Sequence, residues 1–276
     1  MESIAIDGAE LSSMTLGQGP AVVMLHGLAT GNMASWFSAI ASPLSARYKI
    51  VLYDQRGHGG SGSTTSGFDL DTQAEDLQAV LAYHGLNHEP VDLVGHSMGA
   101  LIALHYALSR PDRIRRLVLV DAPMPAREYI APSLLGARSR EELSYWMEHE
   151  LAVSAGLRGR RRQRLQQRLE TLLFETTLRQ DVLAMDSEPD TALSKLNMPV
   201  LLVYGRSSPC LAVGEHLRCV LPQARLETLD CGHYIPEEAP AALCALLDEY
   251  LSLPLNDMTL PLKLEPSGSM QTIGVA

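Results

Sequence analysis

The feature that most constrains this chain is a short apolar strand pattern that ends in a G-x-S-x-G pentapeptide, Val91-Asp-Leu-Val-Gly-His-Ser-Met-Gly99. A helical pattern follows at once, so the serine occupies a strained strand-to-helix turn, where a side chain at Gly95 or Gly99 would collide with neighbouring backbone. The turn lifts the Ser97 hydroxyl clear of a sheet. It also aims the Met98 amide and the start of the helix at the point where negative charge appears on an attacked carbonyl. The pattern therefore predicts a nucleophilic serine.

Short apolar runs alternate with amphipathic helical patterns along most of the chain. This alternation is typical of an α/β fold with a mostly parallel sheet and helices on both faces. The 276 residues, 46% of them hydrophobic, are enough for one large domain with an insertion. We expect eight strands, at residues 4–6, 14–16, 22–25, 50–53, 91–94, 117–120, 200–204 and 225–229.

The strand signal disappears between Val120 and Met198, where helical patterns replace it. Ser139 and Glu142 have the spacing of a capping box at the start of one such helix. Pro199 then precedes the next strand pattern. We therefore predict a core at residues 1–122 and 198–252, an inserted helical lid at residues 123–197, and an extended tail at residues 253–276.

The charge and cysteine content exclude several classes of protein. A net charge of −10 and an isoelectric point near 5.3 disfavour nucleic acids and anionic membranes as partners. The chain has neither a signal-peptide pattern at its start nor eighteen consecutive apolar residues, so we expect a cytoplasmic protein. Its four cysteines form no C-x-x-C pair and are interpreted as reduced apolar residues, with no metal site.

A serine nucleophile needs a base, which a histidine from elsewhere in the fold can provide. Among nine histidines, His233 stands directly after the last strand pattern, which places it on the same carboxyl-end rim of the sheet as Ser97. The run Leu25-His-Gly-Leu28 follows another strand, and its Gly27 lets the backbone approach the site. The sequence therefore predicts His233 as the base and the Leu28 amide as a second oxyanion donor beside that of Met98.

The chain resembles the α/β-hydrolase superfamily, in particular its lidded serine hydrolases of the esterase and thioesterase branch, over about residues 1–252. Four motifs carry the resemblance: Leu25-His-Gly-Leu28, Tyr53-Asp-Gln-Arg-Gly-His-Gly-Gly-Ser61, Gly95-His-Ser-Met-Gly99 and Cys231-Gly-His233. The resemblance implies Ser97 as nucleophile, His233 as base, and the Leu28 and Met98 amides as oxyanion hole. It also implies that Asp54, Arg56 and His58 shape the floor of the site without transferring protons.

The sequence departs from this resemblance at the acid that orients the base. Relatives usually carry it just after the seventh strand, in a pattern like Gly-x-x-Asp, but here the text is Gly205-Arg-Ser-Ser208. A neutral hydroxyl cannot stabilise the imidazolium that forms during catalysis. Asp121 is the best substitute, because it follows the sixth strand beside the strand of Ser97, where some superfamily members place their acid. Two alternatives remain. One is Asp230, although it is too near His233 in sequence to orient the ring easily, and the other is a dyad without an acid.

The serine nucleophile and the resemblance together predict hydrolysis of a carboxylic ester, or of a related acyl bond, in a small molecule. The reaction proceeds through an acyl-enzyme intermediate and needs no metal or organic cofactor. Apolar side chains of the lid and of the base loop are the candidates for substrate contact. They are Met124, Tyr129, Trp146, Met147 and Tyr234.

A run of arginines in the predicted lid stands out in this acidic chain. It is either a solvated helix face or a docking surface for an anionic carrier, which would make the protein a thioesterase or acyltransferase acting on an acyl group bound to an acidic carrier protein or coenzyme A. A third hypothesis is a ligand receptor or scaffold with little turnover, which Ser208 favours and the intact Ser97 and His233 oppose. The arginines are Arg158, Arg160, Arg161, Arg162, Arg164 and Arg168.

Overall fold

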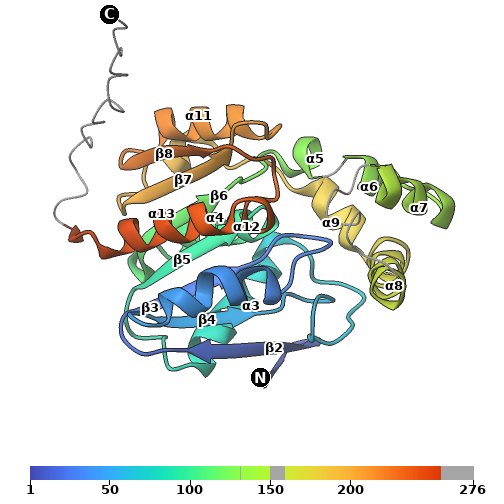
Figure 1. Ribbon diagram of the computed structural model, residues 1–276, viewed down its shortest axis with the longest axis horizontal. Coiled ribbons are helices and arrows are strands. Elements are labelled where there is room, and N and C mark those ends of the chain that lie inside the picture. The colour runs from blue at the N-terminus through green and yellow to red at the C-terminus, as the bar shows by residue number, and fades with distance from the viewer. Residues whose placement is uncertain (131, 150–158, 256–276) are drawn as a thin grey trace, which may run out of the picture.

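An eight-stranded sheet forms the centre of the computed structural model, which describes residues 1–255 except 131 and 150–158 (Figure 1). The strand order is β1-β2-β4-β3-β5-β6-β7-β8. β2 runs antiparallel to β1 and β4, and the remaining neighbours are parallel. The strands are β1 Glu2–Ile6, β2 Ala9–Leu16, β3 Ala21–Leu25, β4 Lys49–Tyr53, β5 Val91–His96, β6 Ile114–Val120, β7 Val200–Gly205 and β8 Ala224–Leu229. Each predicted apolar run lies within one of them, which confirms the predicted sheet.

Helices cover both faces of the sheet, because alternate strand residues point to opposite sides. Val23 and Leu25 of β3 share one core with α3, α4 and α11, whereas Val22 and Met24 share the other with η1 and α13. The helices outside the β6–β7 connection are α1 Ala34–Trp36, η1 Phe37–Ala41, α2 Ser42–Leu44, α3 Leu70–Tyr83, α4 Met98–Ser109, η2 Pro111–Arg113, α11 Leu211–Val220, α12 Ile235–Glu238 and α13 Pro240–Ser252.

Helix α4 begins directly after the pentapeptide serine and is apolar on almost every side. A helix that is hydrophobic all round belongs inside a protein, and α4 packs against β5, β6 and α3. Its buried side chains include Leu101, Ile102 and Tyr106. This burial holds the start of α4, and with it Ser97, in a fixed position against the sheet.

Only helices are present among the described elements between β6 and β7, as the vanishing strand signal predicts. On α7, Leu143, Trp146 and Met147 are buried, and α7 packs against α8. Whether residues 123–197 form a distinct lid on the core stays a prediction, and the predicted tail lies outside the described residues from position 256 onward. These helices are α5 Ala126–Tyr129, α6 Pro132–Gly136, α7 Arg140–His149, α8 Arg160–Phe174, α9 Leu178–Ala184 and α10 Asp190–Leu193.

None of the helices in the described part of the chain is long and apolar enough to cross a membrane.

The register of the parallel strands brings their carboxyl ends to one rim. Gly95 pairs with Leu25, His96 with Val120, and Gly205 with Leu229. The loops that follow β3, β5, β6, β7 and β8 therefore start at the same edge of the sheet. Crevices at this edge are the usual ligand sites of open α/β sheets.

Candidate active site

The turn at Ser97 has the strained geometry that the pentapeptide predicts. Ser97 has φ of +53° and ψ of −120°, and its amide donates to the Val120 carbonyl at 2.9 Å. A Cβ atom on Gly95 would lie 2.2 Å from the Gly99 carbonyl oxygen, and one on Gly99 would lie 2.5 Å from that of Leu25. Only glycine fits at these two positions, so the local sequence allows α4 to begin directly behind the serine.

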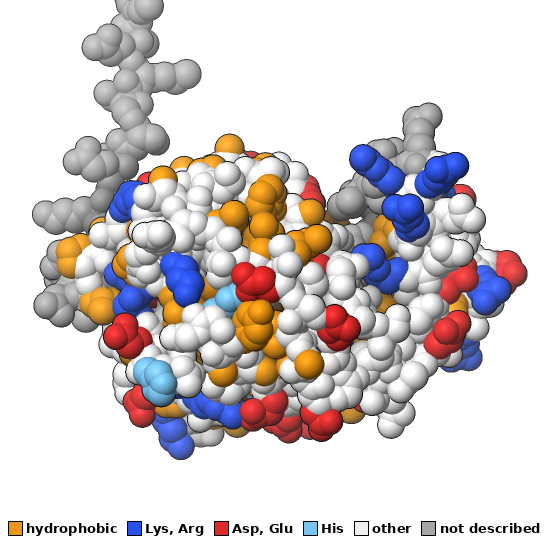
Figure 2. Space-filling view, turned by 90° about the horizontal axis from the view of Figure 1, so that it is seen from below, with side chains coloured by type: hydrophobic (Ala, Val, Ile, Leu, Met, Phe, Trp, Pro, Cys, Tyr) orange, Lys and Arg blue, Asp and Glu red, His pale blue; other side chains and the backbone are white. Residues whose placement is uncertain are grey.

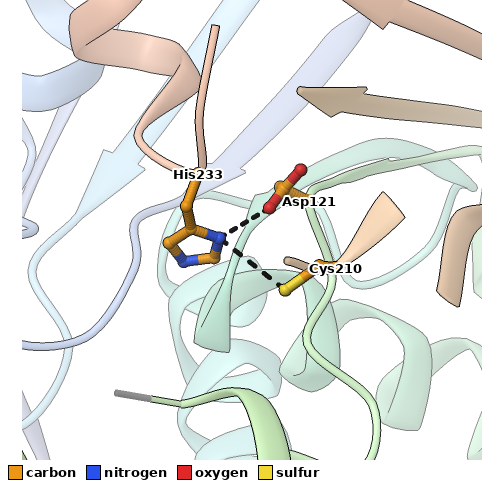
Figure 3. A group of neighbouring side chains, drawn as sticks. All are labelled: Asp121, Cys210 and His233. Carbon is orange, nitrogen blue, oxygen red and sulfur yellow. Dashed lines mark hydrogen bonds and ion pairs between the residues drawn. The ribbon is translucent and has the colours of Figure 1, made fainter. Parts of the chain in front are cut away.

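Ser97, His233 and Asp121 lie within hydrogen-bonding distance in series. His233 Nε2 is 2.9 Å from Ser97 Oγ. His233 Nδ1 is 2.6 Å from Asp121 Oδ2, a contact drawn in Figure 3. A carboxylate accepts hydrogen bonds, so Nδ1 carries the proton and Nε2 presents its lone pair to the serine hydroxyl. The three side chains come from the rim loops after β5, β8 and β6. They have the connectivity of a nucleophile, a base and an orienting acid.

The Asp121 carboxylate is fully buried and surrounded by donors. Its Oδ1 accepts from the Gly205 amide at 3.0 Å, and its Oδ2 accepts from the Ser208 hydroxyl as well as from His233. Asp230, the alternative carboxylate, has an 82% exposed side chain that pairs with Arg206. Of the two carboxylates considered from the sequence, the structure therefore brings Asp121 to the imidazole.

The Leu28 amide lies in a peptide whose orientation is fixed by His26. The Gln55 amide donates to His26 Nε2 at 2.9 Å, so His26 Nδ1 carries the proton and donates to the Gly27 carbonyl at 2.8 Å. Burial lowers the pKa of His26 to about 4, which keeps the ring neutral. A trans peptide directs its N–H opposite to its carbonyl, so the Leu28 N–H points away from His26.

That same peptide passes beside the serine. A Cβ atom on Gly27 would lie 3.1 Å from Ser97 Cβ, and Leu28 lines the same cavity as Ser97. Met98 is the first residue of α4, where a helix leaves backbone amides without an internal partner. Both predicted oxyanion donors thus belong to backbone that adjoins the serine.

His96 is a site residue that the sequence reasoning did not single out. Its Nε2 donates to the His233 carbonyl at 2.9 Å, and burial lowers its pKa to about 4. The neutral ring therefore ties the loop that carries His233 to the turn that carries Ser97. Its position next to the serine in a buried strand was the signal that could have identified it.

Ser97 and His233 open into a cavity of about 230 Å³. Tyr129, Trp146 and Tyr234 line it, as the sequence suggests for substrate contact. Met124 and Met147 are not among its described lining residues, and Met147 is fully buried in the core. The lining also includes residues that the sequence reasoning did not consider: Ile130, Leu134, Pro209 and Glu237.

Asp54, Arg56 and His58 contact their surroundings without reaching Ser97 in any described bond. Asp54 accepts from the Met33 amide at 2.6 Å and from the Gly60 amide at 2.7 Å. Arg56 forms a buried ion pair with Asp76, and His58 Nδ1 donates to the Arg56 carbonyl at 2.8 Å. These contacts fit the expected role in shaping loops below the site.

Cys210 adds a thiol to this cluster. Its Sγ is 3.9 Å from His233 Nδ1, and ligand atoms of Asp121, Cys210 and His233 all lie within 4.8 Å of one another (Figure 3). Thiolate, imidazole and carboxylate are the ligands that zinc prefers, but burial raises the pKa of the Cys210 thiol to about 12. The thiol is therefore protonated near neutral pH, a form that is a poor metal ligand.

The arginines of α8 differ in their surroundings. Arg162 pairs with Glu148 at 2.8 Å, and Arg168 donates to the Gly59 carbonyl at 3.3 Å. Figure 2 shows Lys and Arg side chains gathered at the end of the molecule where α8 lies. Arg158 is outside the described residues. The exposed members are Arg160, Arg161 and Arg164.

Comparison with known proteins shows the family to which the chain belongs. A family model of the alpha/beta hydrolase fold matches residues 20–179. The magnesium-chelatase 30 kDa subunit of Rhodobacter capsulatus is 31% identical over 257 residues, which cover 84% of this chain and 87% of that protein.

Two further matches concern enzymes. Pimeloyl-[acyl-carrier protein] methyl ester esterase of Chromobacterium violaceum is 42% identical over 106 residues, 38% of each chain. The enol-lactonase from Burkholderia xenovorans superposes with a TM-score of 0.73 at 20% identity, over 91% of this chain and 100% of the other. At that identity the superposition shows a common fold.

Proposed function

Because this chain belongs to the α/β-hydrolase family, we propose that it is a serine hydrolase that cleaves a carboxylic ester or a related acyl bond of a small molecule. The observation that carries this proposal is the hydrogen-bonded series from Ser97 through His233 to Asp121, at 2.9 and 2.6 Å. Family membership gives a hydrolase of this fold. The series of contacts supports the serine-hydrolase chemistry that we propose.

The reaction begins when Ser97 Oγ attacks the acyl carbon and its proton passes to His233 Nε2. Asp121 accepts from Nδ1–H and stabilises the imidazolium that forms. The carbonyl oxygen becomes an oxyanion between the Leu28 and Met98 amides. Removal of one such donor typically lowers kcat by about 10²–10³. Collapse of the tetrahedral intermediate breaks the bond to the leaving group, which takes the proton from His233.

The second half of the reaction regenerates the enzyme. A water molecule gives a proton to His233 Nε2 as its oxygen attacks the acyl carbon of the acyl-enzyme. The second tetrahedral intermediate occupies the same oxyanion hole, and Ser97 Oγ leaves with the proton from His233. The products are a carboxylic acid and a free serine.

The cavity favours a compact acyl group. Its volume of about 230 Å³ is below the usual range of drug-sized sites, and Ile130, Leu134 and Trp146 give it an apolar wall. These residues come from the segment 123–197, which we propose acts as a lid. Trp146→Ala enlarges the cavity, so we expect the preferred acyl chain of the variant to be longer than that of the wild type.

Hydrolysis of p-nitrophenyl esters of increasing acyl length tests the proposal. We expect turnover by the wild type and a loss of about 10⁴ or more in kcat for Ser97→Ala. Ser109→Ala is the matched control, because Ser109 is an exposed serine at the other end of α4. Absence of turnover on every ester would favour a receptor or scaffold, which the subunit name of the Rhodobacter relative keeps open.

A thioesterase or acyltransferase that acts on a carrier-bound acyl group is the second candidate. Arg160, Arg161 and Arg164 are exposed on a protein of net charge −10, and the Chromobacterium relative is named for an acyl-carrier-protein substrate. Glutamate at these three positions should then raise KM for an acyl-carrier-protein ester and leave KM for a p-nitrophenyl ester unchanged. Arg218→Glu, on the exposed side of α11, is the control. If the triple variant had the wild-type KM for the acyl-carrier-protein ester, carrier docking through these arginines would be contradicted.

A further inference from the structure

We propose that Ser208 is a positioning residue that holds the Asp121 carboxylate for the reaction by donating its hydroxyl proton to it. The inference rests on the proposed function, because it assigns Asp121 the part of the orienting acid. Ser208 occupies the position where the resemblance to α/β hydrolases implies a carboxylate. In our proposal Ser208 does not replace the acid at this position but donates a hydrogen bond to it.

The direction of the Ser208 hydroxyl follows from its contacts. The Cys210 amide donates to Ser208 Oγ at 3.1 Å, so the oxygen already accepts one hydrogen bond. The hydroxyl proton is then available for Asp121 Oδ2, which lies within hydrogen-bonding distance. The Ser208 amide donates to the Gly205 carbonyl at 3.0 Å, and its side chain is buried. These bonds fix the backbone of the residue, and burial keeps water from replacing its hydroxyl.

Asp121 needs this donor because its charge is removed from water. A buried carboxylate is stable only when donors replace its lost solvation. Its donors include the Gly205 amide on Oδ1 and, on Oδ2, the Ser208 hydroxyl together with His233 Nδ1. The Cys210 thiol also interacts with this carboxylate. Ser208 therefore binds the same oxygen that orients the base. Without it, that oxygen loses a neutral partner and its charge concentrates towards the imidazole.

Backbone packing brings the two loops together. A Cβ atom on Gly205 would lie 2.1 Å from the Gly232 carbonyl oxygen, and the Ser207 amide donates to the Cys231 carbonyl at 3.1 Å. The loop after β7 is thus held against the loop that carries His233. Ser208 is one residue beyond this contact, which places its side chain at the buried junction of both loops with Asp121.

The test compares Ser208→Ala and Ser208→Thr with the wild type across a pH profile of kcat/KM for one p-nitrophenyl ester. Loss of the hydroxyl should lower kcat about tenfold with KM unchanged, the usual effect of removing a hydrogen bond to a charged group. The acid limb of the profile should move up by about half a unit to one unit, because the less solvated carboxylate favours the protonated imidazole. Threonine keeps the hydroxyl and should restore both values.

Ser207→Ala is the matched control, since Ser207 is the adjacent and exposed serine. Thermal unfolding of each variant shows that it is folded, and a shifted pH profile separates positioning from a purely structural role. The inference about Ser208 would be overturned if Ser208→Ala kept the kcat and the acid limb of the wild type while Asp121→Asn was inactive. Full activity of Asp121→Asn would instead overturn the proposed acid itself.

Discussion

Replacement of Asp121 by asparagine is the most informative single change, because the structure dictates how the new amide is oriented. The Gly205 amide donates to Asp121 Oδ1 at 3.0 Å and requires an acceptor there. The asparagine carbonyl oxygen must therefore take this position, and its NH₂ group must replace Oδ2. That group then faces His233 Nδ1, 2.6 Å away in the wild type.

An NH₂ group in this place selects the wrong imidazole tautomer. It donates to Nδ1, so the ring proton moves to Nε2, and the lone pair that should receive the Ser97 proton is lost. The same change in a serine-protease triad lowers the rate roughly 10⁴-fold, which corresponds to about 5 kcal/mol of barrier. We expect kcat for a p-nitrophenyl ester to fall by about 10³–10⁴, with KM changed less than threefold.

The assay measures kcat and KM at pH 8 after circular dichroism has shown that the variant is folded. Asp230→Asn is the control, because that carboxylate is exposed and pairs with Arg206. The control should keep the activity of the wild type within about twofold, as surface ion pairs contribute little. A kcat for Asp121→Asn above a tenth of the wild-type value would refute the role of Asp121.

Two further predictions concern stability. Gly95→Ala should prevent formation of the serine turn and abolish activity, because its Cβ would lie 2.2 Å from a backbone oxygen; Gly136→Ala, whose Cβ has nothing within 4 Å, should change neither activity nor stability. Burial lowers the pKa values of His26 and His96 to about 4 and that of His58 to about 3, so the unfolded chain binds more protons below pH 6.5. The free energy of unfolding should therefore fall as pH drops from 6.5 towards 4, by about 2 kcal/mol for each histidine at pH 5. Urea unfolding at pH 7 and pH 5 measures this loss, and equal values would show that these rings are not buried in the neutral form.

The sequence predicted the parts of the site that depend on local pattern. Strand runs and glycine turns located Ser97 and His233 at one rim, and the missing carboxylate at position 208 directed attention to Asp121. The sequence could not predict that Ser208 would form a hydrogen bond with Asp121, because that contact joins two loops whose separation is set by packing. Periodicity on α7 also could not separate Trp146, which lines the cavity, from Met147, which is fully buried and is not among the lining residues.

The measurement that tests the central claim most directly is covalent labelling of the folded protein with a fluorophosphonate probe, read by peptide mass spectrometry. Phosphonylation requires a serine whose proton can be taken by a base and whose oxyanion is stabilised, so it reports the whole arrangement at once. We predict one adduct, on Ser97. It should be absent in Ser97→Ala, and its rate of formation should be strongly reduced in Asp121→Asn. A folded wild-type protein that stays unlabelled, or that carries its adduct on another residue, would contradict a serine hydrolase centred on Ser97.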